Sequence, residues 1–484
     1  MAIVTQIDLL KKRRTKIVAT LGPASATPEM IKQLILAGAN VFRLNMSHGD
    51  HDSHRKTYAH IRALSEEMKL PIGILADLCG PKIRTGKFRD GEILLTSGTE
   101  VTVTTRDVEG EPGLIPSQYT ALNTDVTPGN RILLNDGLME LRVISIKATE
   151  ILCQVIHGGI LKNHKGINLP GVNVSAPSLT EKDRKDAAFA LELGVDFLAL
   201  SFVRRAADIG DLRKIIHDSG NSTSIIAKIE KPEALADIEQ IVDAADAIMV
   251  ARGDLGVELN PEEVPVAQSQ LIDQARANFK PVIVATQMLE SMIESARPTR
   301  AEVTDIAHAV TLGADAVMLS AETASGKFPL ESVQMMDRIA RQTESHLWKN
   351  HSYGTRIVKS SSTPLPIWDV MANATAYISK DIMAHAIVVI SASGMSAATM
   401  SSARPSAPVV AITSREDVFR RIALLWGVIP VYSSNAGKIN PNDVARDAAL
   451  ELGLAAPGEY ILLVRGFHSK PELNIPSITC LMIP

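Results

Sequence analysis

The stretch Ser224–Glu258, SIIAKIEKPEALADIEQIVDAADAIMVARGDLGVE, decides the fold. A short β-branched run, Ile225–Ile229, predicts a strand, and Pro232 suits the first turn of a helix that we expect to close near Ala245. A second apolar run, Ala247–Val250, predicts the next strand. The order strand, helix, strand is that of a parallel βαβ unit.

Charged residues follow both predicted strands of this unit. Lys228 and Glu230 share one face of the first strand, because alternate residues of a strand point the same way, and Arg252, Gly253 and Asp254 follow the second. Open α/β sheets and α/β barrels carry their chemistry at the carboxyl ends of their strands. Two carboxylates beside one lysine suit a hard metal ion next to a fixed positive charge. A buried salt bridge that pins the strands is the alternative, and we favour the site.

Composition narrows the class of protein. With 484 residues the chain has room for two to four domains, and 45% hydrophobic and 21% charged residues are ordinary for a soluble globular protein. Aromatic residues make up only 4%, so the core must consist of aliphatic side chains and methionine. The net charge is −4 and no segment is broadly basic, which argues against nucleic acid as the main ligand.

The sequence favours a cytoplasmic protein. Cys79, Cys153 and Cys480 lie far apart without metal-binding spacing, as is usual in a reducing compartment. The short apolar run at the N-terminus precedes the basic segment 11–14, which is the reverse of the order in a secretory signal. No run approaches the roughly 18 apolar residues of a membrane span, so we expect no membrane association.

Alternation of strands and helices predicts an eight-stranded parallel structure. The expected strands are Lys16–Thr20, Asn40–Asn45, Pro71–Asp77, Val195–Phe202, Ile225–Ile229, Ala247–Val250, Pro281–Thr286 and Asp315–Ser320. One further helix is expected to end at Gly38, and another to follow Pro329. The other helices expected in this part cover 53–68, 178–194, 206–219, 262–278 and 300–312. Eight such units argue for an α/β fold with a closed (β/α)8 TIM barrel. An eight-stranded open, doubly wound sheet is the competing arrangement.

Two further regions break this alternation. Residues 79–176 carry short alternating runs cut by Gly, Pro, Asn and Asp, which is typical of a small all-β domain inserted into the barrel. A polar segment at 350–364 indicates a linker, and strands expected at 386–391, 409–413, 428–432 and 460–464 indicate a separate α/β domain. We therefore divide the chain into a barrel (1–78 and 177–348), an inserted domain (79–176) and a C-terminal domain (349–484).

Polar side chains gather at the predicted carboxyl ends of the barrel strands. They are Arg43, Asn45, Ser47, Asp77, Lys82, Arg84, Lys228, Glu230, Arg252, Asp254, Thr286, Gln287, Ser320 and Glu322. Taken singly, each has a structural explanation such as an ion pair or a helix cap. Together they offer oxygen ligands for a hard metal and several cations, a combination that fits a phosphorylated, carboxylated substrate held on Mg²⁺.

Motifs along essentially the whole chain resemble the pyruvate kinase family. They are KIVATLGPAS (16–25), VFRLNMSHG (41–49), ADLCGPKIRTG (76–86), KGINLPG (165–171), SIIAKIE (224–230), IMVARGDLG (248–256), ATQMLESM (285–292), RPTRAEVTD (297–305) and VMLSAET (317–323). The resemblance implies a TIM barrel with a small β-barrel lid inserted after the third strand and a C-terminal α/β regulatory domain. It also implies transfer of a phosphoryl group from phosphoenolpyruvate to ADP, giving ATP and pyruvate, by a homotetramer that uses Mg²⁺ or Mn²⁺.

The resemblance also implies roles for individual residues. Glu230 and Asp254 would hold the divalent metal, Lys228 would stabilise the phosphoryl group in transfer, and Arg43 would bind the substrate phosphate. The backbone amides of Gly253 and Asp254, with the Thr286 hydroxyl, would bind the substrate carboxylate. We therefore expect Arg252 to support neighbouring loops and not to act as a ligand. Three further groups are nucleotide contacts (Asn45, His48, Arg84, Lys165), a monovalent-cation site (Asn45, Ser47, Asp77 and the Leu78 carbonyl) and a water relay that protonates the enolate (Ser320, Glu322).

Two positions depart from the pattern of many members. Leu78 and Lys82 stand where many potassium-dependent members have Thr and Glu, so the Lys82 ammonium could replace the monovalent cation. We therefore expect activity without K⁺.

The second departure lies in the C-terminal loop SASGMSAA, between a predicted strand and helix. Such a loop either binds a phosphate at the helix N-terminus or is a plain N-cap turn. The resemblance makes it an effector site formed by Ser391, Ser393, Gly394 and Ser396, although Met395 stands where many members have Arg or Lys. We expect activation by a sugar phosphate or a nucleoside monophosphate.

Two rival functions remain. An aldolase-type lyase acting on metal-bound enolpyruvate would need Glu230 and Asp254, but has no use for the inserted domain, Arg84 or Lys165. A catalytically inactive paralogue would not need the set Lys228, Glu230, Asp254, Arg43 and Thr286.

Overall fold

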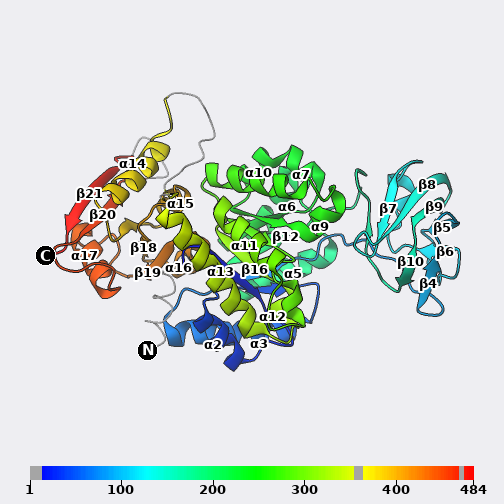
Figure 1. Ribbon diagram of the computed structural model, residues 1–484, viewed down its shortest axis with the longest axis horizontal. Coiled ribbons are helices and arrows are strands. Elements are labelled where there is room, and N and C mark those ends of the chain that lie inside the picture. The colour runs from blue at the N-terminus through cyan, green and yellow to red at the C-terminus, as the bar shows by residue number, and fades with distance from the viewer. Residues whose placement is uncertain (1–12, 351, 354–363, 468–473) are drawn as a thin grey trace.

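The computed structural model describes residues 13–350, 352–353, 364–467 and 474–484. The basic segment 11–14 that bears on the secretory-signal argument is only partly included, and most of the predicted linker lies outside the described residues. The molecule has three parts in a row, with the barrel between the C-terminal domain and the inserted domain (Figure 1). Within the described ranges, no helix is long and apolar enough to cross a membrane.

The central part is a closed barrel of eight parallel strands. In spatial order they are β1 (Lys16–Thr20), β16 (Ala316–Leu319), β15 (Val282–Ala285), β14 (Ala247–Ala251), β13 (Ser224–Ile229), β12 (Phe197–Leu200), β3 (Gly73–Asp77) and β2 (Val41–Asn45). All eight predicted strands are present, so the barrel prediction is confirmed and the open doubly wound sheet is wrong.

Helices surround the barrel. They are α2 (Pro28–Ala37), α3 (His51–Met68), α5 (Glu181–Leu193), α6 (Ala206–Asp218), α7 (Pro232–Ala236), α8 (Ile238–Ala244), α9 (Arg252–Glu258), α10 (Val264–Ala277), α11 (Arg300–Leu312), α12 (Ala321–Ala324) and α13 (Pro329–Lys349), with the 3-10 turn η1 (Glu290–Ile293). Local signals set several boundaries. Thr27, Thr180 and Thr299 cap helix N-termini with their side chains.

One predicted helix is divided. The segment expected to be continuous from Pro232 to about Ala245 breaks at Asp237, where the backbone leaves the helical region. The Asp237 carboxylate accepts a hydrogen bond from the Ala206 amide at 2.9 Å, at the start of α6. A contact with a neighbouring element thus accompanies a break that local propensity does not reveal.

The amino end of the barrel carries a fourfold pattern. A polar residue stands just before every second barrel strand. Its side chain accepts a hydrogen bond from a backbone amide of the preceding barrel strand in the sequence. The pairs are Asn40 with Ile17 (3.0 Å), Asp196 with Ile74 (2.8 Å), Asp246 with Ile225 (2.8 Å) and Asp315 with Val282 (3.1 Å). These bonds satisfy amides at the strand starts, which suits the stabilising role of this face of the barrel.

The C-terminal domain closes the same end of the barrel. Its Leu424 is fully buried and packs with apolar side chains that fill the barrel interior, among them Val18 and Leu75. Arg420 and Arg404 of this domain form ion pairs of 2.9 and 2.8 Å with Asp196 and Asp315. Apolar packing and buried charge pairs therefore fix the two parts together.

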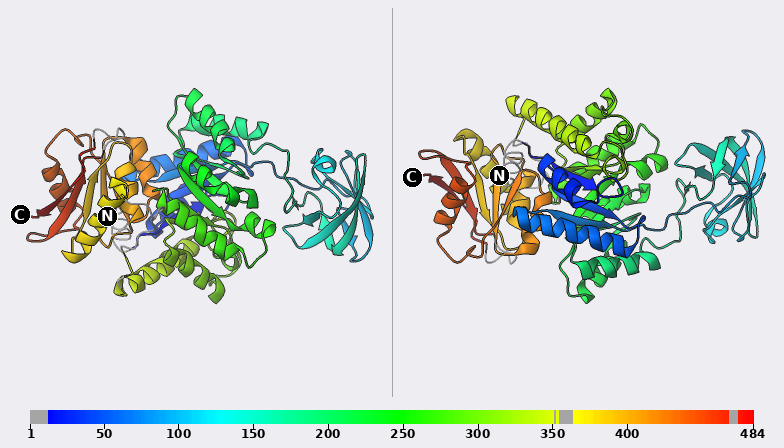
Figure 2. Two further views of the ribbon diagram at one scale, coloured as in Figure 1. Left: turned by 90° about the horizontal axis from the view of Figure 1, so that it is seen from above. Right: turned by 90° about the horizontal axis from the view of Figure 1, so that it is seen from below.

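The inserted part is a curled β-sheet domain at the opposite end of the molecule (Figures 1 and 2). Its strands are β4 (Glu92–Leu95), β5 (Glu100–Thr104), β6 (Leu114–Pro116), β7 (Arg131–Leu134), β8 (Met139–Lys147), β9 (Glu150–His157), β10 (Gly159–Lys162) and β11 (Ile167–Asn168), with a short helix α4 (Leu122–Asp125). They form a six-stranded sheet, in the order β11-β7-β8-β9-β5-β6, and a β10-β4 pair around one apolar core. Figure 2 shows two chain segments joining this domain, hereafter the lid, to the barrel.

The C-terminal part is an α/β domain with a five-stranded sheet. Its strand order is β19 (Val428–Tyr432), β18 (Val409–Thr413), β17 (Ile387–Ile390), β20 (Tyr460–Arg465) and β21 (Ser477–Met482). The helices are α14 (Ile367–Asp381), α15 (Met395–Ser402), α16 (Glu416–Arg421) and α17 (Pro441–Glu451), with the turn η2 (Ile422–Leu424). Four of the strands were predicted, whereas β21, which pairs antiparallel with β20, was not. The predicted fold class is confirmed.

Candidate active site

A polar cavity of about 140 Å³ lies at the carboxyl ends of the barrel strands. Thirteen of the predicted site residues line it, namely Arg43, Asn45, Ser47, His48, Asp77, Leu78, Lys82, Arg84, Lys228, Glu230, Asp254, Thr286 and Ser320. The predicted residues Gly253, Lys165 and Glu322 do not line it. Residues from six barrel strands and their following loops thus meet in one place, as the strand-end argument predicts.

Lys228 is the centre of the charge network in this cavity. Its ammonium lies 2.9 Å from Glu230 Oε1 and 3.3 Å from Asp77 Oδ1, and it donates a hydrogen bond of 2.6 Å to Ser201 Oγ. Burial alone lowers the pKa of Lys228, but the charges of Asp77 and Glu230 outweigh burial and raise that pKa above its usual range. The side chain is therefore a permanent cation.

Asp77 joins two cations at the floor of the cavity. Burial raises the pKa of its carboxyl, but Lys228 and then Arg43 lower it further, and the net shift is downward. Arg43 donates from Nε to Asp77 Oδ2 at 2.6 Å and from Nη1 to Thr20 Oγ1 at 3.2 Å. The Arg43 guanidinium is thus held in place at the cavity wall.

Glu230 and Asp254 form the acidic side of the cavity. Burial raises the pKa of Glu230 above its usual range, Lys228 opposes this shift and the nearby Asp254 adds to it. Glu230 Oε2 also accepts the Phe202 amide at 2.7 Å. Two carboxylates this close in a buried site suit a divalent cation, which would relieve their repulsion.

The two carboxylates fit Mg²⁺ or Mn²⁺, which keep water ligands, better than a metal ion that is coordinated by protein side chains alone. In the part of the chain that the structure describes, no cluster of three or more His, Cys, Asp or Glu side chains could hold a metal ion. Mg²⁺ commonly binds one or two carboxylates and completes its octahedron with water and substrate oxygens. Glu230 and Asp254 therefore fit that ion.

The start of α9 contacts a strained residue at the end of β15. Thr286 has φ +70°, a conformation that is unfavourable for a β-branched residue and costs about 1–3 kcal/mol. Its hydroxyl accepts the Gly253 amide at 2.7 Å and donates to the Ala285 carbonyl at 2.6 Å. Strain of this kind is concentrated at functional sites, and here it holds a hydroxyl over the first turn of α9.

Arg252 supports neighbouring loops instead of lining the cavity. Its guanidinium donates to the Thr286 carbonyl at 2.7 Å and to Asp305 Oδ1 at 2.7 Å. The strand-end pattern alone counted it among the candidate ligands, and these contacts agree with the expectation that it supports neighbouring loops.

The residues predicted for a monovalent cation lie together. Asn45 Oδ1 accepts the Ser47 amide at 3.2 Å, and the Leu78 carbonyl accepts Ser201 Oγ at 2.7 Å. Lys82 is exposed and lines the same cavity. A lysine therefore shares the cavity with this oxygen-rich group.

Two of the predicted nucleotide contacts lie on neighbouring segments of the lid. Arg84 forms a β-bridge with Gly166 and donates to the His164 carbonyl at 3.0 Å. The Lys165 amide donates to Thr85 Oγ1 at 3.0 Å. Arg84 lines the cavity and Lys165 lies beside it on the lid, so a movement of the lid would move both cations together.

Ser320 and Glu322 are adjacent but differently exposed. Ser320 lines the cavity, whereas Glu322 is buried behind it and accepts the amides of Leu289 at 3.0 Å and Ser320 at 2.6 Å. Glu322 thus fixes the loop that carries Ser320.

The strand-end argument missed two residues. Ser201 follows β12 and bridges Lys228 to the Leu78 carbonyl, and Thr20 ends β1 and accepts from Arg43. Both stand at strand ends, so the same argument applied to the first and fourth strands would have found them.

The predicted effector loop lies in the C-terminal domain, on the far side of the barrel from the lid (Figure 1). Gly394 has φ +89° and its amide donates to Ser391 Oγ at 3.0 Å. The Met395 amide lies 3.4 Å from Ser393 Oγ, and the Met395 side chain is exposed at the start of α15. The serines therefore cap their own loop in this structure.

Comparison with known proteins identifies the family. The chain matches the pyruvate kinase barrel domain over residues 12–333 and the pyruvate kinase alpha/beta domain over residues 369–478. It is 44% identical over 463 residues to a pyruvate kinase of Geobacillus stearothermophilus, covering 94% of this chain and 78% of that enzyme. It is 45% identical over 461 residues to one of Agrobacterium vitis, covering 94% and 95%.

A solved structure agrees over the full length. The crystal structure of a pyruvate kinase from Cryptosporidium parvum superposes with a TM-score of 0.90 at 36% identity, covering 99% of this chain and 97% of that one. The chain therefore belongs to the pyruvate kinase family and is a phosphotransferase built on a TIM barrel.

Proposed function

We propose that the cavity at the barrel mouth transfers the phosphoryl group of phosphoenolpyruvate to ADP, giving ATP and pyruvate. The observation that carries this proposal is the meeting of two cations, Lys228 and Arg43, with two carboxylates, Glu230 and Asp254, in one cavity. Phosphoryl transfer depends on positioning and on neutralising charge on the transferred group, for which this set is suited.

Each side chain has a role that follows from its surroundings. Lys228 is a permanent cation that stabilises the transferring phosphoryl group, and Arg43, held by Asp77 and Thr20, binds the substrate phosphate. Glu230 and Asp254 hold Mg²⁺ or Mn²⁺, which when bound neutralises phosphate charge.

The other end of the substrate binds at α9. Amides of Gly253 and Asp254 and the hydroxyl of Thr286 bind the carboxylate at the first turn of this helix, where backbone donors favour an anion. The Gly253 amide exchanges its bond with Thr286 for one with the substrate. Ser320, held by Glu322, orients the water that delivers a proton to the enolate carbon.

The lid supplies part of the binding site for the nucleotide. Arg84 and Lys165 bind the phosphates of ADP together with Asn45 and His48 of the barrel. Closing the lid over the cavity excludes water, which would otherwise intercept the phosphoryl group. The lid comprises residues 79–176, the barrel 1–78 and 177–348, and the C-terminal domain 349–484.

A coupled assay tests the reaction. Pyruvate release must require ADP as well as phosphoenolpyruvate and a divalent metal. Pyruvate formation that is independent of ADP would instead favour a lyase or a phosphatase, and absence of turnover would favour an inactive paralogue.

We also propose that the enzyme does not need K⁺. The Lys82 ammonium lines the cavity beside the Asn45, Ser47, Asp77 and Leu78 group and supplies the positive charge there. Activity should persist when a quaternary ammonium salt replaces K⁺ at constant ionic strength. An absolute requirement for K⁺ would refute this assignment.

We also propose an allosteric effector and an oligomeric state for the enzyme. A sugar phosphate or nucleoside monophosphate binds the loop of Ser391, Ser393, Gly394 and Ser396 and activates the enzyme. The enzyme is a cytoplasmic homotetramer. Titration of sugar monophosphates and AMP against the phosphoenolpyruvate saturation curve tests the effector. An unchanged curve with every compound would rule it out.

A further inference from the structure

Helix α9 carries two carboxylates one turn apart, and they serve different neighbours. Asp254 stands in its first turn and lines the catalytic cavity, whereas Glu258 is its last residue and is buried. Residues four apart lie on the same face of a helix, one above the other. The helix therefore extends from the metal side of the cavity to a second charged group.

Glu258 joins three separate parts of the chain. Its Oε1 accepts Lys231 Nζ at 2.5 Å, just after the end of β13, and Asn168 Nδ2 at 3.2 Å, at the end of the lid strand β11. The Lys231 side chain is 12% exposed and that of Glu258 1%, so the pair is shielded from solvent screening. One carboxylate oxygen thus connects the lid, α9 and the strand that carries Lys228 and Glu230.

A second contact between α9 and the lid lies one residue earlier. Gly137, in the lid turn between β7 and β8, faces the Val257 side chain, which lies 3.5 Å from the position of a Cβ at residue 137. Asn135, Asp136 and Gly137 all have positive φ, so this turn has a tightly defined shape. The last turn of α9 therefore meets the lid at two points.

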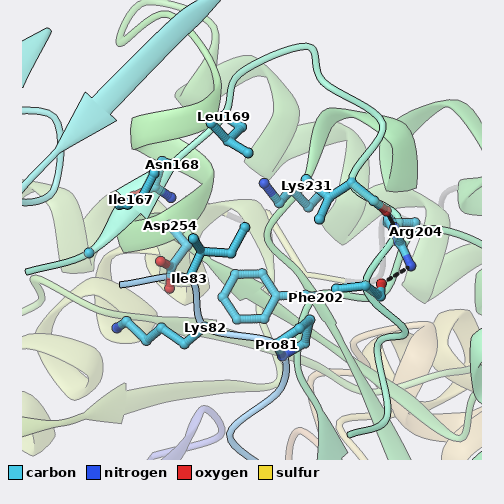
Figure 3. Close-up of a pocket in the computed structure, with 13 residues that line it drawn as sticks. Pro81, Lys82, Ile83, Ile167, Asn168, Leu169, Phe202, Arg204, Lys231 and Asp254 are labelled. Carbon is cyan, nitrogen blue, oxygen red and sulfur yellow. Dashed lines mark hydrogen bonds between the residues drawn. The ribbon is translucent and has the colours of Figure 1, made fainter. Parts of the chain in front are cut away.

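The junction also encloses a small cavity of its own. Asn168, Lys231 and Asp254 line it together with Phe202 and Leu169 (Figure 3). Asp254 lines both this cavity and the catalytic one, so it forms part of the wall between them. Glu258 Oε2 is buried and has no hydrogen-bond partner among the described residues, which leaves an acceptor for a further donor when the lid changes position.

We propose that Glu258 is a positioning residue that couples the metal site to the lid through α9, with Asn168 as its partner on the lid. Binding of the divalent cation at Asp254 fixes the first turn of α9, and the Glu258–Asn168 bond transmits that constraint to the lid hinge. By reciprocity, the state of the lid hinge sets the affinity for the cation. This inference rests on the proposed role of Asp254 as a metal ligand.

Mn²⁺ affinity of the free enzyme, measured by electron paramagnetic resonance, tests the coupling without substrates. We expect Asn168→Ala and Glu258→Gln each to weaken Mn²⁺ binding by about fivefold or more. The two variants test different contacts, because Asn168→Ala removes the bond to the lid, whereas Glu258→Gln keeps an acceptor for Asn168 and removes the ion pair with Lys231. Glu140→Gln is the matched control, since Glu140 pairs with Arg131 inside the lid and, within the described residues, forms no hydrogen bond to α9.

A second readout follows the lid hinge directly. Cys79 lines the catalytic cavity at the start of the lid connection, and its alkylation rate can be measured peptide by peptide with the exposed Cys480 as an internal reference. At Mn²⁺ concentrations that saturate each protein, Cys79 should be protected less in Asn168→Ala than in the wild type or Glu140→Gln.

The outcomes separate this inference from the proposed function. Mn²⁺ affinities of Asn168→Ala and Glu258→Gln within twofold of the wild type, or equal losses in Glu140→Gln, would overturn the coupling while ADP-dependent pyruvate formation by the wild type stands. Wild-type protein that binds Mn²⁺ but forms no pyruvate would refute the proposed function and leave the coupling measurable.

Discussion

At the scale of single residues, Lys228 shows how burial and charge decide a role. The loss of hydration disfavours its charged form, yet Asp77 and Glu230 more than restore it. The same two carboxylates need the lysine, because buried charges are tolerated when they are paired. Sequence spacing identified Lys228 and Glu230, whereas the partnership with Asp77 depends on β3, which is far away in the sequence.

Replacing Lys228 tests this role. Lys228→Met keeps the length of the side chain and removes the charge that we propose stabilises the transferring phosphoryl group. We expect kcat to fall by at least about 10³-fold, the upper range for loss of one preorganised electrostatic contact, with the circular dichroism spectrum unchanged. Lys327→Met, at a lysine that is 65% exposed, is the control and should retain full activity. Comparable kcat values in the two variants would contradict the assignment.

Lys82 provides a second test at this scale. Lys82→Glu replaces the cation proposed to stand in for K⁺ with an anion, in the cavity that the Asn45, Ser47, Asp77 and Leu78 group also lines. Activity without K⁺ should then fall by roughly tenfold to a hundredfold, and added K⁺ should restore most of it. The measurement is kcat/KM for phosphoenolpyruvate across a K⁺ titration. A variant that stays equally active without K⁺ would show that Lys82 does not replace the cation.

At the scale of elements, three of the four residues before every second strand are aspartates, and these differ in burial. The Asp196 side chain is 2% exposed and pairs with both Arg62 and Arg420, whereas the equivalent Asp246 is 36% exposed and pairs with Arg213. Buried pairs leave uncompensated charge when one partner is removed, and exposed pairs are screened by water.

We therefore expect substitutions at the two positions to lower the free energy of unfolding by different amounts. Asp196→Ala should lower the free energy of unfolding by about 3–5 kcal/mol, and Asp246→Ala by about 1 kcal/mol. Both lie at the end of the barrel opposite the catalytic cavity, so kcat should be unaffected by either. Urea denaturation of the two variants provides the comparison. Equal losses would show that burial does not set the contribution of these carboxylates.

Local signals account for most of the elements, and long-range contacts for the exceptions. The strand Lys16–Thr20 and the helix Arg300–Leu312 have the predicted boundaries, because apolar periodicity and caps set them. The break at Asp237 accompanies a bond to Ala206, and β21 gains its partner only by pairing with β20. Similarly, Arg252 stands at a strand end like a ligand, but its engagement by Asp305 requires the position of α11.

At the scale of the whole molecule, the barrel is closed at one end by another domain and carries the lid at the other (Figure 2). The lid meets the barrel through the polar contacts of Asn168 and Arg204 and through Val257, which faces Gly137. The C-terminal domain is attached through apolar packing of Leu424 and buried ion pairs. We therefore expect mobility at the lid, where the proposed reaction requires it, and rigidity at the base of the barrel.

Replacing Leu424 tests whether apolar packing makes the attachment of the C-terminal domain rigid. Leu424→Ala removes the side chain that packs into the base of the barrel, and leaves a cavity that neighbouring strands cannot readily fill. We expect a loss of about 2–5 kcal/mol in the stability of the joined barrel and C-terminal domain. In calorimetry this should appear as a lower transition temperature and as separation of the barrel and C-terminal transitions. Leu450→Ala, at a side chain that is 42% exposed in the same domain, should leave the transition nearly unchanged. If both variants melt like the wild type, packing at the barrel base does not hold the domains together, and the ion pairs of Arg404 and Arg420 must carry the attachment.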